Sequence, residues 1–339
     1  MHVQQIDPDD AASFDAWYAV LRVTDEERWP RIPGWSRREI HAMASHAGGA
    51  TEYQCLAATD ETGATVGIGL FELARRDNLH RTSLDVRVLP GYRRRGTGTA
   101  IVAEAERRNA AEGRSMVNGF CEVPTDMLAS DPSAPFARRL GFAPTQTAHR
   151  RHLSLPPDAT RLAPRRAEVA VAAVGYRIFT FATPWPIEYL DDQCELRRRM
   201  STDAPSGDAH EDEESWDAAR VEEADDLLAA QGLTRLAAVA EHIDSGRLVA
   251  FTELALPGQR PTEAWQWATL VRREHRGHRL GLAVKLANLD YLATVFPEAR
   301  LVITGNAQEN APMIAVNEML GFEVAATATF WQKDLAAPQ

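Results

Sequence analysis

Runs of hydrophobic residues alternate along the chain with polar, glycine-broken turns, and their order predicts interleaved strands and helices. A short strand is expected around residues 3–6, two strands joined by a Gly turn over residues 55–73, and another strand over residues 82–89. An Arg- and Gly-rich turn and an Ala-rich helix follow at residues 91–106. This order of elements predicts a mixed α/β (α+β) fold, with a twisted sheet and flanking helices.

The same order of elements occurs a second time in the chain. Landmarks of the first half recur 183 residues later, and three such pairs are Val88 and Val271, Arg93 and Arg276, and Gly98 and Gly281. Two Leu-Gly-Phe endings, at Phe142 and Phe322, lie 180 residues apart. Landmarks that keep their order and spacing indicate a duplicated domain.

The boundaries between the copies follow from composition. The stretch LSLPPDATRLAPRRAE contains three prolines and charges of both signs, which is typical of a linker between domains. We therefore expect an N-terminal domain over residues 1–155, a linker over residues 156–169 and a C-terminal domain over residues 170–339.

Composition and charge narrow the kinds of partner and site. The 339 residues carry a formal net charge of −11, and this acidic balance argues against a nucleic-acid partner. No apolar run approaches the length of a membrane span, so no membrane partner is expected. The three dispersed cysteines indicate neither a disulfide framework nor a zinc site, so we expect a cytoplasmic protein without a metal site.

The turn GYRRRGTG, residues 91–98, carries the candidate chemistry. It stands between a predicted strand and a predicted helix, and the first amides of a helix are free to bind an anion. Glycines at positions 96 and 98 would let a pyrophosphate approach the backbone, and the arginines add charge-assisted hydrogen bonds. The pattern is neither the G-x-G-x-x-G of dinucleotide folds nor a P-loop.

The stretch VLPGYRRRGTG resembles the acyl-coenzyme A signature of the GNAT superfamily of N-acetyltransferases. The resemblance covers both halves, as in the duplicated architecture of mycothiol-synthase-like proteins, and it implies acetyl-CoA as co-substrate. In the first copy the implied cofactor-binding residues are Val88, Arg93, Arg94, Arg95, Gly96, Gly98 and Thr99. In the second copy they are Val271, Arg276, Gly277, His278, Leu280 and Gly281, with Arg279 at the place of the first glycine.

The same resemblance implies where catalysis occurs. The family's N-x10-G-F pattern, which lines the thiol end of the site, is matched by Asn310 and the Gly-Phe pair ending at Phe322. The place of the tyrosine that usually protonates the departing thiolate is taken by Asn317 in the second copy and by Ala137 in the first. Glu253 is the preferred general base, so we expect the second domain to perform the chemistry.

The expected reaction is direct attack of a primary amine on acetyl-CoA in a ternary complex. The acidic stretch over residues 203–226 would attract a small cationic acceptor, although a solvated acidic face is the simpler interpretation. The missing tyrosines favour an alternative, a non-catalytic acyl-CoA-binding scaffold or sensor. We expect a monomer or a homodimer.

Overall fold

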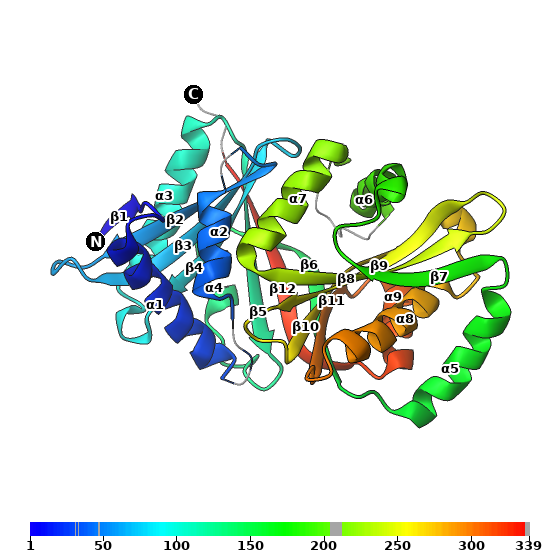
Figure 1. Ribbon diagram of the computed structural model, residues 1–339. Helices are drawn as coiled ribbons and strands as arrows, with labels where there is room; N and C mark the ends of the chain where they lie inside the picture. Colours follow the sequence, from blue (N-terminus) through cyan, green and yellow to red (C-terminus); the bar gives the residue numbers. More distant parts are fainter. Residues whose placement is uncertain (31, 33, 47, 204–211, 336–339) are drawn as a thin grey trace. The chain divides into compact units, whose positions relative to one another are not determined.

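The chain forms two compact units in the computed structural model, which describes residues 1–30, 32, 34–46, 48–203 and 212–335 (Figure 1). Unit 1 consists of Met1–Thr147 and Thr327–Gln339, and unit 2 consists of Ala148–Ala326. Both units combine a mixed sheet with helices on its two faces, so the predicted fold class is confirmed.

Unit 1 is built on a sheet with the strand order β1-β2-β3-β4-β5-β12. Its elements are β1 (His2–Gln5), α1 (Ala11–Arg28), α2 (Arg37–Ser45), β2 (Thr51–Thr59), β3 (Thr65–Ala74), β4 (Arg81–Val88), α3 (Thr97–Ala111), β5 (Met116–Pro124), α4 (Ser133–Arg139) and β12 (Glu323–Asp334). A 3-10 turn, Pro90–Tyr92, lies between β4 and α3.

Local sequence explains how the helices of unit 1 begin and which face they bury. The Asp10 side chain accepts a hydrogen bond from the Ala12 amide and caps α1, and Ser36 forms a capping box with Glu39 at the start of α2. Phe14 and Trp17 of α1 are fully buried against one face of the sheet together with α2. Helix α3 packs on the opposite face (Figure 1).

Unit 2 repeats this plan with the strand order β7-β8-β9-β10-β11-β6. Its elements are β6 (Ala143–Ser154), α5 (Ala159–Ala172), β7 (Tyr176–Ala182), α6 (Leu190–Asp203), α7 (Ala218–Gln231), β8 (Leu233–His242), β9 (Arg247–Pro257), β10 (Glu263–Val271), α8 (Leu280–Val295), β11 (Leu301–Ala307) and α9 (Ala311–Leu320). Helices α5, α8 and α9 cover one face of its sheet, and α6 and α7 lie on the other (Figure 1).

Each sheet contains a strand from the other half of the chain. Strand β6 follows the elements of unit 1, but Ala148–Ser154 pair antiparallel with Leu301–Ala307 of β11 in unit 2. Strand β12 is the last strand of the second copy, yet Trp331 packs in the core of unit 1 beside Val117 and Phe142. The hydrophobic pattern of a strand does not specify its partner strand, so this exchange was not predicted.

The compact units therefore differ from the continuous domains expected over residues 1–155 and 170–339. Residues 148–155 belong to unit 2, and residues 327–339 belong to unit 1. The expected linker over residues 156–169 is mostly helical, because α5 begins at Ala159 with Asp158 as its cap and includes Pro164. Helix α5 packs against α8 and α9.

Candidate functional site

In unit 1 the central parallel strands pair for only part of their length. Strands β4 and β5 are in register from Arg81 with Met116 to Leu84 with Gly119, and the rest of β4, as far as Val88, has no partner on β5. Unpaired backbone amides and carbonyls at such an opening are available to an extended ligand. Strands β10 and β11 of unit 2 likewise stop pairing after Trp265 and Ile303.

The turn that follows β4 has two residues in left-handed backbone conformations. Arg94 has φ 62° and Gly96 has φ 88°, and Gly96 caps the start of α3. The place of a side chain on Gly96 is open, whereas a Cβ on Gly98 would lie 3.0 Å from the Phe136 ring. The turn therefore presents the first amides of a 15-residue helix to an open space.

The turn of unit 2 has the same backbone conformation with glycine and arginine exchanged. Gly277, with φ 92°, corresponds to Arg94, and Arg279, with φ 55°, corresponds to Gly96. The preceding arginines are nearly superimposable in conformation, at φ −69° and ψ 156° for Arg93 and φ −70° and ψ 158° for Arg276. The departure from the sequence pattern at Arg279 therefore leaves the turn intact.

Arg93 and Arg276 stabilise their turns through internal contacts. The Arg93 Nε donates to the Val88 carbonyl at 3.1 Å, and its guanidinium forms an ion pair with Glu27. In unit 2, Arg276 Nε donates to the carbonyl of Val271 at 3.2 Å and its guanidinium lies 3.0 Å from Asp203. Both side chains thus hold the end of a strand against a helix.

The remaining charges differ between the two turns. Arg94 and Arg95 are exposed, and neither has a carboxylate partner within the described ranges; Arg95 lies over the Tyr92 ring at 5.5 Å. In unit 2, Arg279 lies 3.4 Å from Glu168, and Arg273 shares Asp203 with Arg276. An anion therefore encounters unneutralised cations at the turn of unit 1 but neutralised ones at the turn of unit 2.

Glu253, the expected base, is the centre of a buried ion-pair cluster in unit 2. It is 1% exposed, and its Oε1 atom lies 2.8 Å from Arg197 and 3.3 Å from Arg235. Burial alone would raise the pKa of Glu253, but the two guanidinium groups outweigh burial and hold the pKa below its ordinary value. A buried carboxylate with a low pKa is a poor proton acceptor, so these contacts argue against its predicted role.

The two expected catalytic asparagines also have structural contacts. Asn310 caps α9 by accepting a hydrogen bond from the Met313 amide at 3.3 Å. Asn317 is fully buried and accepts a hydrogen bond from Lys285 Nζ at 2.9 Å. Burial lowers the pKa of Lys285 to about 7. These contacts support a role for both asparagines in holding α9, beside which Lys285 is buried.

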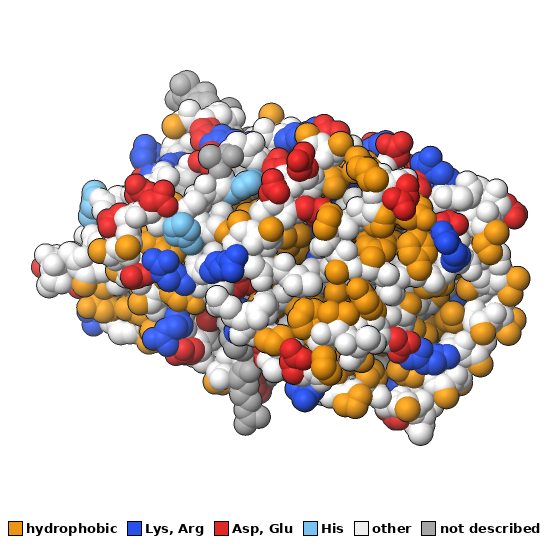
Figure 2. Space-filling view, in the orientation of Figure 1, with side chains coloured by type: hydrophobic (Ala, Val, Ile, Leu, Met, Phe, Trp, Pro, Cys, Tyr) orange, Lys and Arg blue, Asp and Glu red, His pale blue; other side chains and the backbone are white. Residues whose placement is uncertain are grey.

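Several carboxylates in the described part of the acidic stretch over residues 203–226 have structural contacts; residues 204–211 lie outside the described ranges. Asp217 caps α7, Asp225 forms an ion pair with Arg235, and Glu214 accepts a hydrogen bond from the Trp216 ring nitrogen at 2.9 Å. On the face drawn in Figure 2, acidic side chains over α6 and α7 stand beside basic and hydrophobic ones.

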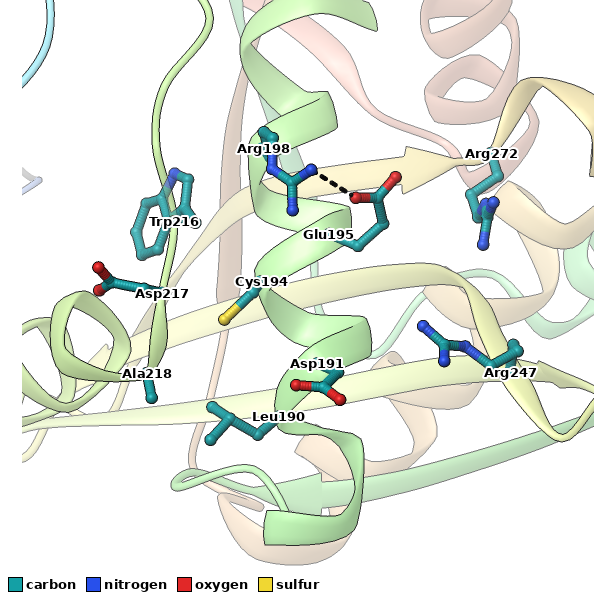
Figure 3. Close-up of a pocket in the computed structure, with 10 residues that line it drawn as sticks. All are labelled: Leu190, Asp191, Cys194, Glu195, Arg198, Trp216, Asp217, Ala218, Arg247 and Arg272. Atoms are coloured by element: carbon teal, nitrogen blue, oxygen red, sulfur yellow. Dashed lines mark ion pairs between the residues drawn. The ribbon is translucent and has the colours of Figure 1, made fainter.

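A hollow of about 500 Å³ lies beside α6 in unit 2 (Figure 3). Its charged lining is balanced, with three carboxylates and three guanidinium groups, from Asp191, Glu195, Asp217, Arg198, Arg247 and Arg272. Glu195 lies 3.0 Å from Arg198, as the dashed line in Figure 3 marks. This balance does not select for a cation over an anion.

A row of polar side chains crosses the sheet of unit 1 and was missed by sequence reasoning. Tyr53 on β2 is opposite Glu72 on β3, Glu72 is opposite Ser83 on β4, and Ser83 is in register with Asn118 on β5. All four residues are only partly buried. The available signal was one carboxylate in the otherwise apolar strand TVGIGLFELA, which the periodicity alone does not distinguish from a solvated position.

The comparisons with known proteins agree with this geometry. Residues 14–142 match the sequence model of the Acetyltransferase (GNAT) family. Unit 1 is thus similar to GNAT acetyltransferases over most of its length. The tandem GNAT protein from the clavulanic acid biosynthesis pathway is 28% identical, with a TM-score of 0.79 and coverage of 100% of this chain and 99% of that one. The predicted resemblance to tandem GNAT proteins is therefore confirmed.

More distant structures share the fold. A GCN5-related N-acetyltransferase from Sphaerobacter thermophilus is 16% identical, with a TM-score of 0.64 and coverage of 98% of this chain and 95% of that one. Saccharomyces cerevisiae N-myristoyltransferase, solved with bound myristoyl-CoA, is 13% identical, with a TM-score of 0.59 and coverage of 98% and 79%. No curated protein matches the chain.

These similarities indicate the general reaction. The likeness to GNAT acetyltransferases supports acyl transfer in general, with acetyl-CoA as the co-substrate. Among the described residues, no helix is long and apolar enough to cross a membrane.

Proposed function

We propose that the protein transfers the acetyl group of acetyl-CoA to a primary amine of a small molecule, and that acetyl-CoA binds at the turn of unit 1. The observation that carries the proposal is the turn before α3, where open helix amides stand beside the unneutralised Arg94 and Arg95. The splayed ends of β4 and β5 would receive the pantetheine arm as an added strand.

Each residue of the turn then has a defined contribution. The amides after Gly96, including those of Gly98 and Thr99, would donate to the pyrophosphate, and Arg94 and Arg95 would add charge-assisted hydrogen bonds. Arg93 would act as a positioning residue through its contact with the Val88 carbonyl. The matching turn of unit 2 would have a structural role in that unit and would not bind the coenzyme, because carboxylates of unit 2 neutralise its arginines.

The coenzyme site is tested by placing a negative charge on the turn. Gly96→Asp puts a Cβ and a carboxylate where the pyrophosphate would lie, so affinity for acetyl-CoA should fall by more than about tenfold, or about 1.4 kcal/mol. Isothermal titration calorimetry of the full-length protein measures this change.

Gly113→Asp is the matched control, because Gly113 also has a positive φ of 68° and open surroundings, at the opposite end of α3. Its affinity should stay within about twofold of wild type, well under the tenfold step. Equal loss in the two variants would attribute the effect to backbone strain and contradict the proposed site.

The acceptor is tested by a screen of primary amines with acetyl-CoA, in which release of the free thiol is followed. Release that depends on the amine supports acetyl transfer. The alternative function, a non-catalytic acyl-CoA binder, is favoured by Ala137 at the place of the family's usual acid and by the ion pairs of Glu253. Tight binding of acetyl-CoA without amine-dependent thiol release would select that alternative.

A further inference from the structure

We propose that Glu72 is the catalytic base of unit 1, which removes a proton from the ammonium group of the acceptor on the sheet face covered by α1 and α2. This inference rests on the proposed function, because it assigns a residue to the acetyl transfer described above. It replaces Glu253 of unit 2, whose carboxylate is occupied by two arginines.

The position of Glu72 beside the splayed strands is the first argument. Glu72 is directly opposite Ser83, and Ser83 precedes Leu84, the last residue of β4 that pairs with β5. Neighbouring strands lie about 4.8 Å apart, so Glu72 is one strand spacing from the point where β4 and β5 separate. An amine bound at this face would lie between the Glu72 carboxylate and a thioester held in the opening.

The carboxylate of Glu72 is also available. Glu72 is partly exposed, and within the described part of the chain it forms no hydrogen bond or ion pair of its own. Asp85, two residues beyond Ser83 on the same face of β4, is held by Arg87 at 3.0 Å. Glu72 is thus the carboxylate on this row that an incoming ammonium group would find without a cationic partner in contact.

The electrostatic surroundings suit a proton acceptor. Burial raises the pKa of Glu72, and the positive charge of Arg81 offsets part of that increase. Burial also raises the pKa of Tyr53, and the nearby charge of Glu72 adds to this effect. A base with a raised pKa takes a proton more readily.

The titratable and charged groups around this row come from several elements. On the strands they are Tyr53, Cys55, Arg81, Asp85, Arg87 and Glu122, and on the helices packed over this face they are Asp25 on α1, Glu39 on α2 and His46 at the end of α2. Asp25 contacts Arg87 at 3.3 Å, and Glu39 is committed to the capping box of α2. Asp25 and Glu39 are therefore engaged in contacts of their own, whereas Glu72, among the described residues, is not.

The second copy provides an internal comparison. The residue 183 positions after Glu72 is Ala255, and the register of β8, β9 and β10 places Ala255 between Arg235 and Trp265. Unit 2 therefore has an alanine at the place of the carboxylate and an arginine at the place of Tyr53. This change accompanies the neutralised turn of unit 2, so both differences point to unit 1 as the catalytic unit.

The step conserves atoms and charge. Glu72 takes one proton from the ammonium group, and the freed nitrogen lone pair attacks the thioester carbonyl of acetyl-CoA. The C–N bond forms and the C–S bond breaks, and the second nitrogen proton passes to the departing thiolate. The products are the acetylated amine and free coenzyme A thiol, and Glu72 returns its proton to solvent.

The test uses the full-length protein, acetyl-CoA and the primary amine that gives the fastest thiol release in the screen. Glu72→Gln should lower kcat/KM for the amine about 100-fold or more, and the acid limb of the pH profile should disappear. The KM for acetyl-CoA should not change, because the turn of unit 1 is untouched. Glu52→Gln on β2 is the matched control; its exposed ion pair with Arg75 lies on the other face, and activity should be retained.

A second measurement needs no acceptor. The Glu72 carboxyl carbon, assigned in a ¹³C NMR titration by its absence from Glu72→Gln, should titrate above the ordinary range of glutamate. A midpoint at or below that range overturns the proposal. So does a Glu72→Gln variant with wild-type kcat/KM and pH profile, or an Asp85→Asn variant that alone shows the loss. If wild-type protein releases no thiol with any amine, the proposed function fails, and the role of Glu72 fails with it.

Discussion

The turn before α3 in unit 1 and the turn before α8 in unit 2 have the same backbone conformation in different electrostatic surroundings. Both turns contain two left-handed residues and an arginine bonded to the carbonyl at the end of the preceding strand. In unit 1 two further arginines are open to solvent, and in unit 2 Glu168 and Asp203 neutralise the cations. The shared fold therefore fixes the backbone conformation of the turn but not its charge.

The carboxylates of Glu72 and Glu253, on corresponding strands of the two units, also differ in their electrostatic surroundings. Glu72 on β3 is accessible and has a raised pKa, whereas Glu253 on β9 is buried and has a lowered one. One carboxylate suits proton transfer and the other suits stability. The comparison predicts opposite consequences for the same substitution in the two units.

The largest expected effect on stability comes from Glu253→Gln. This change leaves Arg235, which is 3% exposed, and Arg197 without their shared negative charge, and breaking such a buried pair costs about 3–5 kcal/mol. Glu72→Gln removes no ion pair and should cost less than about 1 kcal/mol. Urea unfolding of the two variants measures the difference, and equal losses would break the comparison.

A smaller effect should appear in the pH dependence of stability through Lys285. Lys285 is 2% exposed and has a pKa of about 7 in the folded protein, against an ordinary value of 10.5. Between these two values the unfolded chain binds a proton that the folded chain does not, so the free energy of unfolding rises with pH. Each pH unit contributes up to about 1.4 kcal/mol.

Lys285→Met removes this titration, so the free energy of unfolding of the wild type should rise relative to that of the variant from pH 7 towards pH 10. Thermal unfolding of both proteins at several pH values measures this difference. A difference that stays constant over this window would show that Lys285 is charged in the folded protein.

The smallest expected effect distinguishes the helix glycines of the two turns. A Cβ on Gly281 would lie 3.6 Å from Val271, an ordinary contact, so Gly281→Ala should stabilise the protein by about 0.4–1 kcal/mol. A Cβ on Gly98 would lie 3.0 Å from the Phe136 ring, which must move. Gly98→Ala should therefore stabilise the protein less than Gly281→Ala, or destabilise it. Denaturant midpoints of the two variants rank them, and the reverse order would place Phe136 away from Gly98.

Sequence reasoning found the features that depend on local pattern. The repeated turns, the mixed α/β fold and the use of acetyl-CoA follow from residues close together in the chain, and they are confirmed. The sequence did not show that Arg279 adopts the left-handed conformation of Gly96, because a missing glycine looks like a missing turn.

The choice of base required information from distant segments. Glu253 was preferred as a strand carboxylate, but its partners Arg197 and Arg235 come from α6 and β8, and its pKa depends on them. Glu72 was identified as a candidate base only from the residues opposite it on neighbouring strands. The strand exchange was hidden for the same reason, since pairing partners are set by tertiary packing.

The exchanged strands also determine the order in which the protein is completed during synthesis. Strand β12 occupies Glu323–Asp334, so unit 1 lacks its Trp331 strand until the ribosome has passed the elements of unit 2. Unit 2 has all its strands before then, because β6 precedes it in the chain. The unit proposed to hold acetyl-CoA is thus finished second, and a nascent chain that stops early has no complete coenzyme-binding unit.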